Sequence, residues 1–270
     1  MSGPGAFERA TSVAPRSPGW YDAYLAEGWD IVGNTNGGYL LSIVANAMVL
    51  ATGRPDPISV TAHYLAPAGA GEASVEVSLV REGRRFSTAR GALSSEGTQR
   101  LQVLGTFGDL DRAPAAPELV LGTPPELPEP EKCLRIEPGE GFPPPFTRQV
   151  EMRLHPDDAR FLEGARSGTP TIRGWLRLPD GEPVGTLALL TLLDSFPPTV
   201  FNVDLPIAWT PTLELTAHVR ARPVPGWLAG EFRTRFVSGG FLEVDGELWD
   251  PSGRLVAQSR QLALVPRGDG

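Results

Sequence analysis

Thr61-Ala62-His63 returns as Thr216-Ala217-His218, and this repeated stretch decides how the chain is expected to fold. Two further landmarks recur at the same offset of 155 residues, namely Phe86 as Phe241 and Gly91 as Gly246. Three separate landmarks with one spacing indicate duplication of a unit of roughly 100 residues. The sequence therefore predicts two similar units that pack as a pseudo-dimer, in which one copy can keep chemistry that the other has lost.

The first copy begins with a segment of helical character. Gly37-Gly38 opens it, apolar residues follow helical spacing as far as Ala51, and Gly53-Arg54-Pro55 ends it. Alternating runs predict the strands that follow, at residues 59–65, 75–79, 86–93 and 101–107. Residues 7–12 and 20–29 are expected to form leading strands.

The second copy repeats this plan. Residues 184–193 are apolar nearly all round, which is typical of a buried helix, and Pro197-Pro198 prevents its continuation. Strands are predicted at residues 150–154, 171–176, 212–220, 231–237, 242–249 and 255–265. Asp250-Pro251-Ser252-Gly253 is a hairpin turn between the last two. A helix followed by a hairpin-connected antiparallel sheet, twice over, predicts an α+β fold.

A proline-rich segment separates the two copies. It includes Pro124-Pro125 and Pro143-Pro144-Pro145, which are incompatible with a regular helix or a central strand. We therefore divide the chain into an N-terminal unit of residues 1–113, an extended linker of residues 114–146 and a C-terminal unit of residues 147–270.

Composition excludes several classes of protein. The chain has 270 residues, a hydrophobic content of 41% and a net charge of −8, which argues against nucleic acid or an anionic membrane as the main partner. The N-terminus lacks the pattern of a signal peptide, and no apolar run is long enough to span a bilayer. A single cysteine, Cys133, and three dispersed histidines give no metal signal. We expect a cytoplasmic protein without a metal or cofactor.

Three stretches carry a resemblance to a known family, namely Gly37-Gly38 and residues 61–67 and 81–90, the last reading Arg-Glu-Gly-Arg-Arg-Phe-Ser-Thr-Ala-Arg. They resemble the type II acyl-CoA thioesterase family and, more narrowly, the thioesterase-like superfamily with a double hotdog fold. The resemblance implies two antiparallel sheets, each wrapped around a long helix, that merge in one chain. It also implies an acyl-CoA substrate, and exposed sheet edges make a homo-oligomer the expectation.

The resemblance further implies a catalytic set of Asp194, Thr212 and Gln261, which together hold a hydrolytic water without a covalent intermediate. Thr216 is the rival to Thr212. From the first copy, Gly37, Gly38 and Tyr39 are expected to bind substrate. An acyl-CoA-binding paralogue that does not hydrolyse its ligand is the alternative function.

The residues themselves support these roles to different degrees. Asp194 follows an apolar helix, and a buried carboxylate tends toward a raised pKa that suits a general base. The alternative is that Asp194 is simply a polar residue that ends the helix, with its carboxylate in solvent. Gln261 shares strand parity with the small residues Ala257, Ser259 and Ala263, unless it lies on the outer face of an edge strand. Thr212 is expected on the same face of its strand as Glu214, Thr216 and His218, and this face is polar. A threonine with a purely structural role is therefore equally compatible with the pattern.

Two features of the first copy bear on the site. Gly37-Gly38 permits either close packing or a helix N-terminus whose amides stabilise an oxyanion. At the 155-residue offset, Asp194 corresponds to Tyr39 and Gln261 to Thr106. This correspondence predicts one active site per chain, assembled by the second copy.

Overall fold

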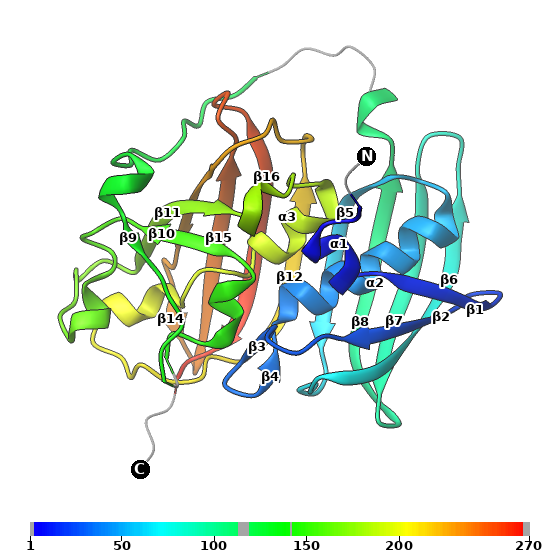
Figure 1. The fold of residues 1–270 in the computed structure, drawn as a ribbon, viewed down its shortest axis with the longest axis horizontal. Helices are drawn as coiled ribbons and strands as arrows, with labels where there is room; N and C mark the ends of the chain where they lie inside the picture. Colours follow the sequence, from blue (N-terminus) through cyan, green and yellow to red (C-terminus); the bar gives the residue numbers. More distant parts are fainter. Residues whose placement is uncertain (1–2, 113–118, 141, 267–270) are drawn as a thin grey trace.

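Two α-helices lie at the centre of a large, curved antiparallel sheet, as seen in a computed structural model that describes residues 3–112, 119–140 and 142–266 (Figure 1). The elements of the first half are α1 (Ala6–Ala10), β1 (Val13–Ser17), β2 (Trp20–Leu25), β3 (Asp30–Ile31), β4 (Asn34–Thr35), α2 (Gly37–Thr52), β5 (Asp56–Tyr64), β6 (Gly71–Glu82), β7 (Ser87–Ser95) and β8 (Thr98–Gly108). The elements of the second half are β9 (Leu134–Arg135), β10 (Glu151–Leu154), β11 (Thr171–Arg177), α3 (Thr186–Leu192), β12 (Thr212–Val219), β13 (Leu228–Arg233), β14 (Val237–Ser238), β15 (Phe241–Trp249) and β16 (Leu255–Leu264).

The sheet is continuous across both halves, whereas the sequence predicted two sheets that merge. In the described residues it has 14 strands in the order β1-β2-β6-β7-β8-β5-β12-β16-β15-β13-β11-β10-β9, with β14 paired to β15. The two halves join where β5 pairs antiparallel with β12. A separate two-stranded sheet contains β3 and β4.

The repeated stretches meet at this junction. Thr61 lies opposite Thr216 in the β5–β12 register, and their hydroxyl groups are 2.9 Å apart. Equivalent residues of the two copies can face each other in this way only next to a local two-fold axis. The pseudo-dimer predicted from the repeat is therefore present in the structure.

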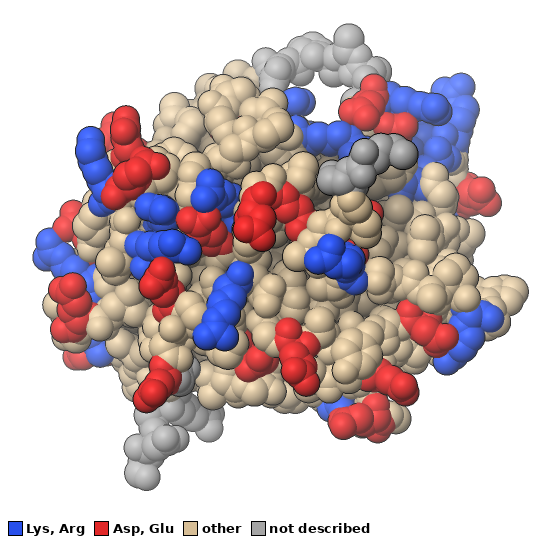
Figure 2. Space-filling model, in the orientation of Figure 1, with Lys and Arg blue, Asp and Glu red and all other residues tan. Residues whose placement is uncertain are grey.

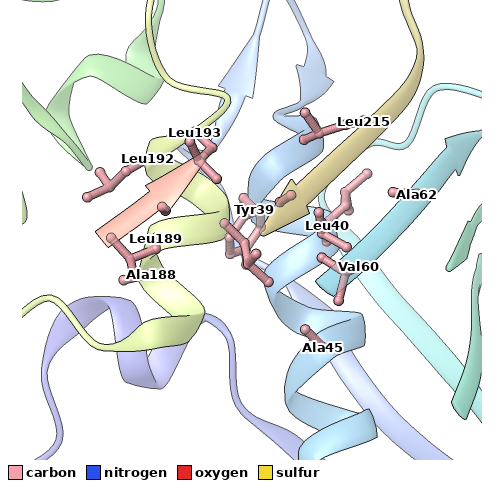
Figure 3. Packing of buried hydrophobic residues seen from close by; sticks show 14 of the residues in the cluster. Tyr39, Leu40, Ala45, Val60, Ala62, Ala188, Leu189, Leu192, Leu193 and Leu215 are labelled. Carbon is pink, nitrogen blue, oxygen red and sulfur yellow. The ribbon is translucent and has the colours of Figure 1, made fainter. Parts of the chain in front are cut away.

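Helix α2 has the bounds that its sequence predicts. The Asn36 side chain caps its start by accepting a hydrogen bond from the Tyr39 amide at 2.8 Å, and Gly53 ends it in the left-handed conformation with φ of 62°. Residues 38–45 are all buried because the helix packs between the sheet and α3. Figure 3 shows Leu40 on α2, Leu189 on α3 and Leu193 directly after α3 within this core.

Helix α3 is shorter than α2, so the offset of 155 residues that relates the strands of the two copies does not relate their helices. It spans seven residues, and a 3-10 turn at Thr199–Asn202 lies between it and β12. At an offset of 155 residues, Tyr39 in the first turn of α2 corresponds to Asp194, which follows the last turn of α3. Equal offset therefore does not mean equal position in the helices.

The prediction of a strand at residues 7–12 was wrong, because residues 6–10 form α1. The Glu182 carboxylate accepts hydrogen bonds from the Phe7 and Glu8 amides, at 3.0 and 3.2 Å. This distant side chain satisfies amide groups that a helix leaves unpaired at its N-terminus. A partner about 175 residues away in sequence stabilises a helix that the local pattern does not indicate.

The proline-rich segment contributes to the second half of the fold. Residues 113–118 lie outside the described ranges. Farther on, β9 pairs with β10, and the Trp175 indole donates to the Pro128 carbonyl at 2.8 Å. The division into units at residues 1–113, 114–146 and 147–270 stays a prediction.

The surface carries both signs of charge. Figure 2 shows acidic and basic side chains interspersed over much of one face. Within the described residues, no helix is long and apolar enough to cross a membrane.

Candidate active site

A cavity of about 860 Å³ opens beside the junction of the two halves. Its lining comes from the start of α2, the ends of β5 and β16, the start of β12 and the segment that follows α3. The wall formed by the second half includes several aromatic side chains, among them Phe146, Phe161, Phe196, Phe201 and Phe232. Such a cavity suits an apolar ligand whose position is fixed by a few polar groups.

Asp194, Thr212 and Gln261 meet at the wall of this cavity. The Gln261 Nε2 atom donates to Asp194 Oδ1 at 3.2 Å and also contacts Thr212 Oγ1. The three residues come from separate places in the sequence: the turn after α3, the first residue of β12 and the end of β16. The structure therefore brings together all three residues of the expected catalytic set.

Thr212 reaches the cavity because β12 contains an irregularity. Its strand parity grouped it with the outward-facing Thr216 and His218, but the register with β16 shifts between Thr212 and Glu214. The shift turns Thr212 inward. The rival Thr216 instead contacts Thr61 and Glu214 and is not among the residues that line the cavity.

Gln261 lies on the inner face of β16, as its parity indicates. Ala257, Ser259 and Ala263 on the same face are all buried, whereas Arg260 and Leu262 on the opposite face are exposed. The small neighbours leave the amide at the cavity wall.

The Asp194 carboxylate also bonds to the start of α2. Its Oδ2 atom accepts the Gly38 amide at 2.8 Å and the Asn36 side-chain amide at 3.3 Å. Asn36 additionally donates to the Asp194 backbone carbonyl at 2.9 Å. Asn36 was not among the site residues predicted from the sequence, although an Asn directly before a helix start is a recognisable capping residue.

Burial raises the pKa of Asp194 from 3.8 to about 6. Desolvation of the ionised carboxylate is the main cause, and the hydrogen bonds from Gly38, Gln261 and Asn36 oppose it. A carboxylate with this pKa is ionised at neutral pH and still basic enough to accept a proton from water. It fits the requirements for a general base.

Gly37 and Gly38 are required because other groups approach their backbone closely. A Cβ atom at Gly38 would lie 2.7 Å from Asp194 Cβ and 2.8 Å from the Leu190 carbonyl oxygen. Gly37 lines the cavity, and its amide donates to no acceptor within the described residues. The structure thus combines the two alternatives, since Gly38 allows close packing and Gly37 presents an amide at a helix N-terminus.

Tyr39 does not reach the cavity, in contrast to its expected role in substrate binding. Its ring stacks on Trp29 with centroids 4.4 Å apart, and its hydroxyl accepts from the Ala26 amide and donates to the Ala10 carbonyl. The side chain is fully buried and ties residues before α2 to that helix. The other residue at the 155-residue offset, Thr106, pairs its hydroxyl with Thr88 on β7.

Tyr39→Phe is therefore expected to reduce stability and leave the cavity unchanged. Loss of the hydroxyl leaves the Ala26 amide and the Ala10 carbonyl without their partner, which costs about 1–3 kcal/mol. Urea unfolding measures this loss, and ligand affinity at the cavity should stay within about twofold. A changed affinity at unchanged stability would instead support the role in binding.

Comparisons with known proteins identify relatives of the chain. Family models of the acyl-CoA thioesterase N-terminal and C-terminal domains match residues 25–108 and 127–265. An uncharacterised protein of Mycobacterium tuberculosis is 30% identical, with 91% of each chain covered. The crystal structure of a candidate thioesterase II from Thermobifida fusca has a TM-score of 0.88 at 33% identity, covering 99% of this chain and 100% of that one. A protein of unknown function with a hot dog fold, from Alicyclobacillus acidocaldarius, has a TM-score of 0.84 at 22% identity, covering 98% and 100%.

Proposed function

This chain belongs to the acyl-CoA thioesterase family, and we propose that it hydrolyses the thioester bond of an acyl-CoA to give CoA and a carboxylic acid. The observation that carries the proposal is the meeting of Asp194, Thr212 and Gln261 at the wall of an apolar cavity. An acyl chain suits the aromatic wall, and the polar groups stand where a thioester can meet water.

Asp194 acts as the general base in this reaction. Thr212 and Gln261 bind a water molecule beside Asp194 Oδ1, and the carboxylate takes a proton from it as the oxygen attacks the thioester carbonyl carbon. A tetrahedral intermediate forms without a bond to the protein. The carbon–sulfur bond then breaks, and the sulfur leaves as the CoA thiol with the proton that Asp194 accepted.

The Gly37 amide stabilises the negative charge that develops on the carbonyl oxygen. Gly37 is the first residue of α2, where amide groups and the helix dipole favour an anion. The neighbouring Gly38 amide is already bonded to Asp194, so it serves to position the base.

The alternative function is a protein that binds acyl-CoA without hydrolysing it. The hydrogen-bonded arrangement around Asp194 favours the enzyme. Such a paralogue has no need for a hydrogen-bonded base, yet Asp194 makes contacts with Gly38, Asn36 and Gln261.

A hydratase or dehydratase would require a histidine beside the carboxylate. No histidine is among the described residues that line the cavity.

Release of free thiol from acyl-CoAs of several chain lengths tests the proposal. We expect the purified protein to release CoA in a manner that depends on chain length, because the cavity has a finite volume. Binding of acyl-CoA without thiol release at any chain length would contradict hydrolysis and identify a binding protein.

A further inference from the structure

Tyr64, the last residue of β5, lines the cavity but takes no part in the contacts between Asp194, Thr212 and Gln261. Its hydroxyl has almost no surface accessible to water and makes no hydrogen bond to any residue that the structure describes. A buried hydroxyl without a partner costs about 1–3 kcal/mol, and native proteins rarely leave one unpaired. An acceptor on a bound molecule would satisfy this hydroxyl.

The Tyr64 ring borders the start of α2 and the base. A Cβ atom placed on Gly37 would lie 2.8 Å from Tyr64 Cε1, 2.9 Å from Tyr64 Cζ and 3.0 Å from Asp194 Oδ2. Since the ring and the carboxylate approach the same point, Tyr64 Cε1 and Asp194 Oδ2 are no more than about 6 Å apart. The absence of a side chain at Gly37 makes this approach possible.

The two oxygens of the Asp194 carboxylate have different partners. Gln261 bonds to Oδ1 and also contacts Thr212, whereas Gly38 and Asn36 bond to Oδ2. Oδ2 lies close to the same point at Gly37 as the Tyr64 ring, and it already accepts these two hydrogen bonds. The Tyr64 hydroxyl is thus a donor without a partner near Gly37, whose amide also has no acceptor among the described residues.

We propose that the Tyr64 hydroxyl donates a hydrogen bond to the carbonyl oxygen of the bound thioester and acts with the Gly37 amide as a second donor to the oxyanion. The inference rests on the proposed thioester hydrolysis. The proposed water lies beside Oδ1, and in this arrangement the carbonyl oxygen points toward the Gly37 amide and the Tyr64 hydroxyl. The bond strengthens as negative charge collects on that oxygen.

Tyr64 keeps its proton throughout the reaction. Burial raises the pKa of its hydroxyl well above the usual range for tyrosine, and the negative charges of Asp194 and Glu214 raise it further. The group therefore serves as a hydrogen-bond donor only, and no bond to Tyr64 forms or breaks.

Tyr64→Phe separates this role from a structural one. We expect kcat to fall on the order of 10²-fold while KM changes less than about threefold, because the donor acts mainly in the transition state. Stability should stay the same or increase, since the variant removes an unpartnered buried hydroxyl. Tyr39→Phe is the matched contrast: its hydroxyl has protein partners, so it should lose stability instead.

Binding of two non-hydrolysable ligands provides a test that does not need turnover. One is a ketone analogue of an acyl-CoA, in which a methylene group replaces the thioester sulfur and the carbonyl remains. The other is an alkyl-CoA thioether, which has no carbonyl. Tyr64→Phe should weaken the ketone by about tenfold and leave the thioether unchanged.

The outcomes distinguish the two proposals. An unchanged kcat in Tyr64→Phe, or equal weakening of both ligands, would overturn the role of Tyr64 while leaving hydrolysis intact. If the wild type releases no thiol but the ketone alone is weakened, hydrolysis is wrong and Tyr64 still binds a carbonyl. Failure to bind either ligand would overturn both.

Discussion

Asp194→Asn is expected to lower kcat for acyl-CoA hydrolysis by on the order of 10²–10⁴-fold, with KM nearly unchanged. Asparagine is almost the same size as aspartate and can still accept the Gly38 amide, but it cannot take a proton from water. Steady-state thiol release over a range of acyl-CoA concentrations measures both constants. Turnover close to that of the wild type would show that Asp194 is not the base.

The dependence on pH gives a second readout of the same residue. The pKa of Asp194 is raised to about 6, so the fraction of ionised base falls as the pH drops below that value. For the wild type, kcat/KM should therefore be level at neutral pH and decline about tenfold per pH unit in the acidic limb. The residual activity of Asp194→Asn should lack this limb.

Stability of the variant shows whether lost activity reflects lost structure. A carboxyl group whose folded pKa lies above its unfolded value destabilises the fold once ionised, so this contribution lowers wild-type stability as the pH rises from 3.8 to about 6. Two pKa units correspond to about 3 kcal/mol. Asparagine carries no such penalty. Asp194→Asn should be more stable than the wild type at pH 7, and the difference should vanish below about pH 4.

The strand pattern of the sequence predicted much of the fold because alternation follows directly from the pleat. Gln261 illustrates this: its small neighbours along β16 indicated an inner face, and the structure has that face buried. The helix α2 was equally readable, since Gly37 and Gly53 mark its two ends. The meeting of Thr61 with Thr216 confirms what the repeat alone had suggested.

Other features depend on contacts that strand parity and offsets do not encode. A register shift after Thr212 reverses the face expected from its parity. Tyr39 shares an offset with Asp194, but α3 is short and ends before Asp194, so the two residues occupy opposite ends of their helices. Tyr64 ends an ordinary strand, and only the tertiary structure reveals that its hydroxyl lacks a partner.

Gly38→Ala should disrupt the site without introducing a charge or removing a functional side chain. The new Cβ would lie 2.8 Å from the Leu190 carbonyl oxygen and 3.0 Å from Thr191 Cα, both backbone atoms of α3. A side-chain rotation cannot relieve these contacts, so α2 and α3 must move apart. The shift displaces Asp194, which is bonded to the Gly38 amide.

We expect Gly38→Ala to reduce kcat/KM by about 10²-fold, because a displacement of about 1 Å in a catalytic group has an effect of that order. Overpacking should also lower the free energy of unfolding by about 1–3 kcal/mol, which the better helix propensity of alanine partly offsets. Thiol release and urea unfolding measure the two effects.

Gly185→Ala is the matched control, since Gly185 precedes α3 at its other end, has φ of −83°, and a Cβ there meets no atom within 4 Å. The control should keep full activity. Full activity in Gly38→Ala as well would mean that the close approach of the helices does not position the base, and Asp194 would then owe its placement to Asn36 and Gln261.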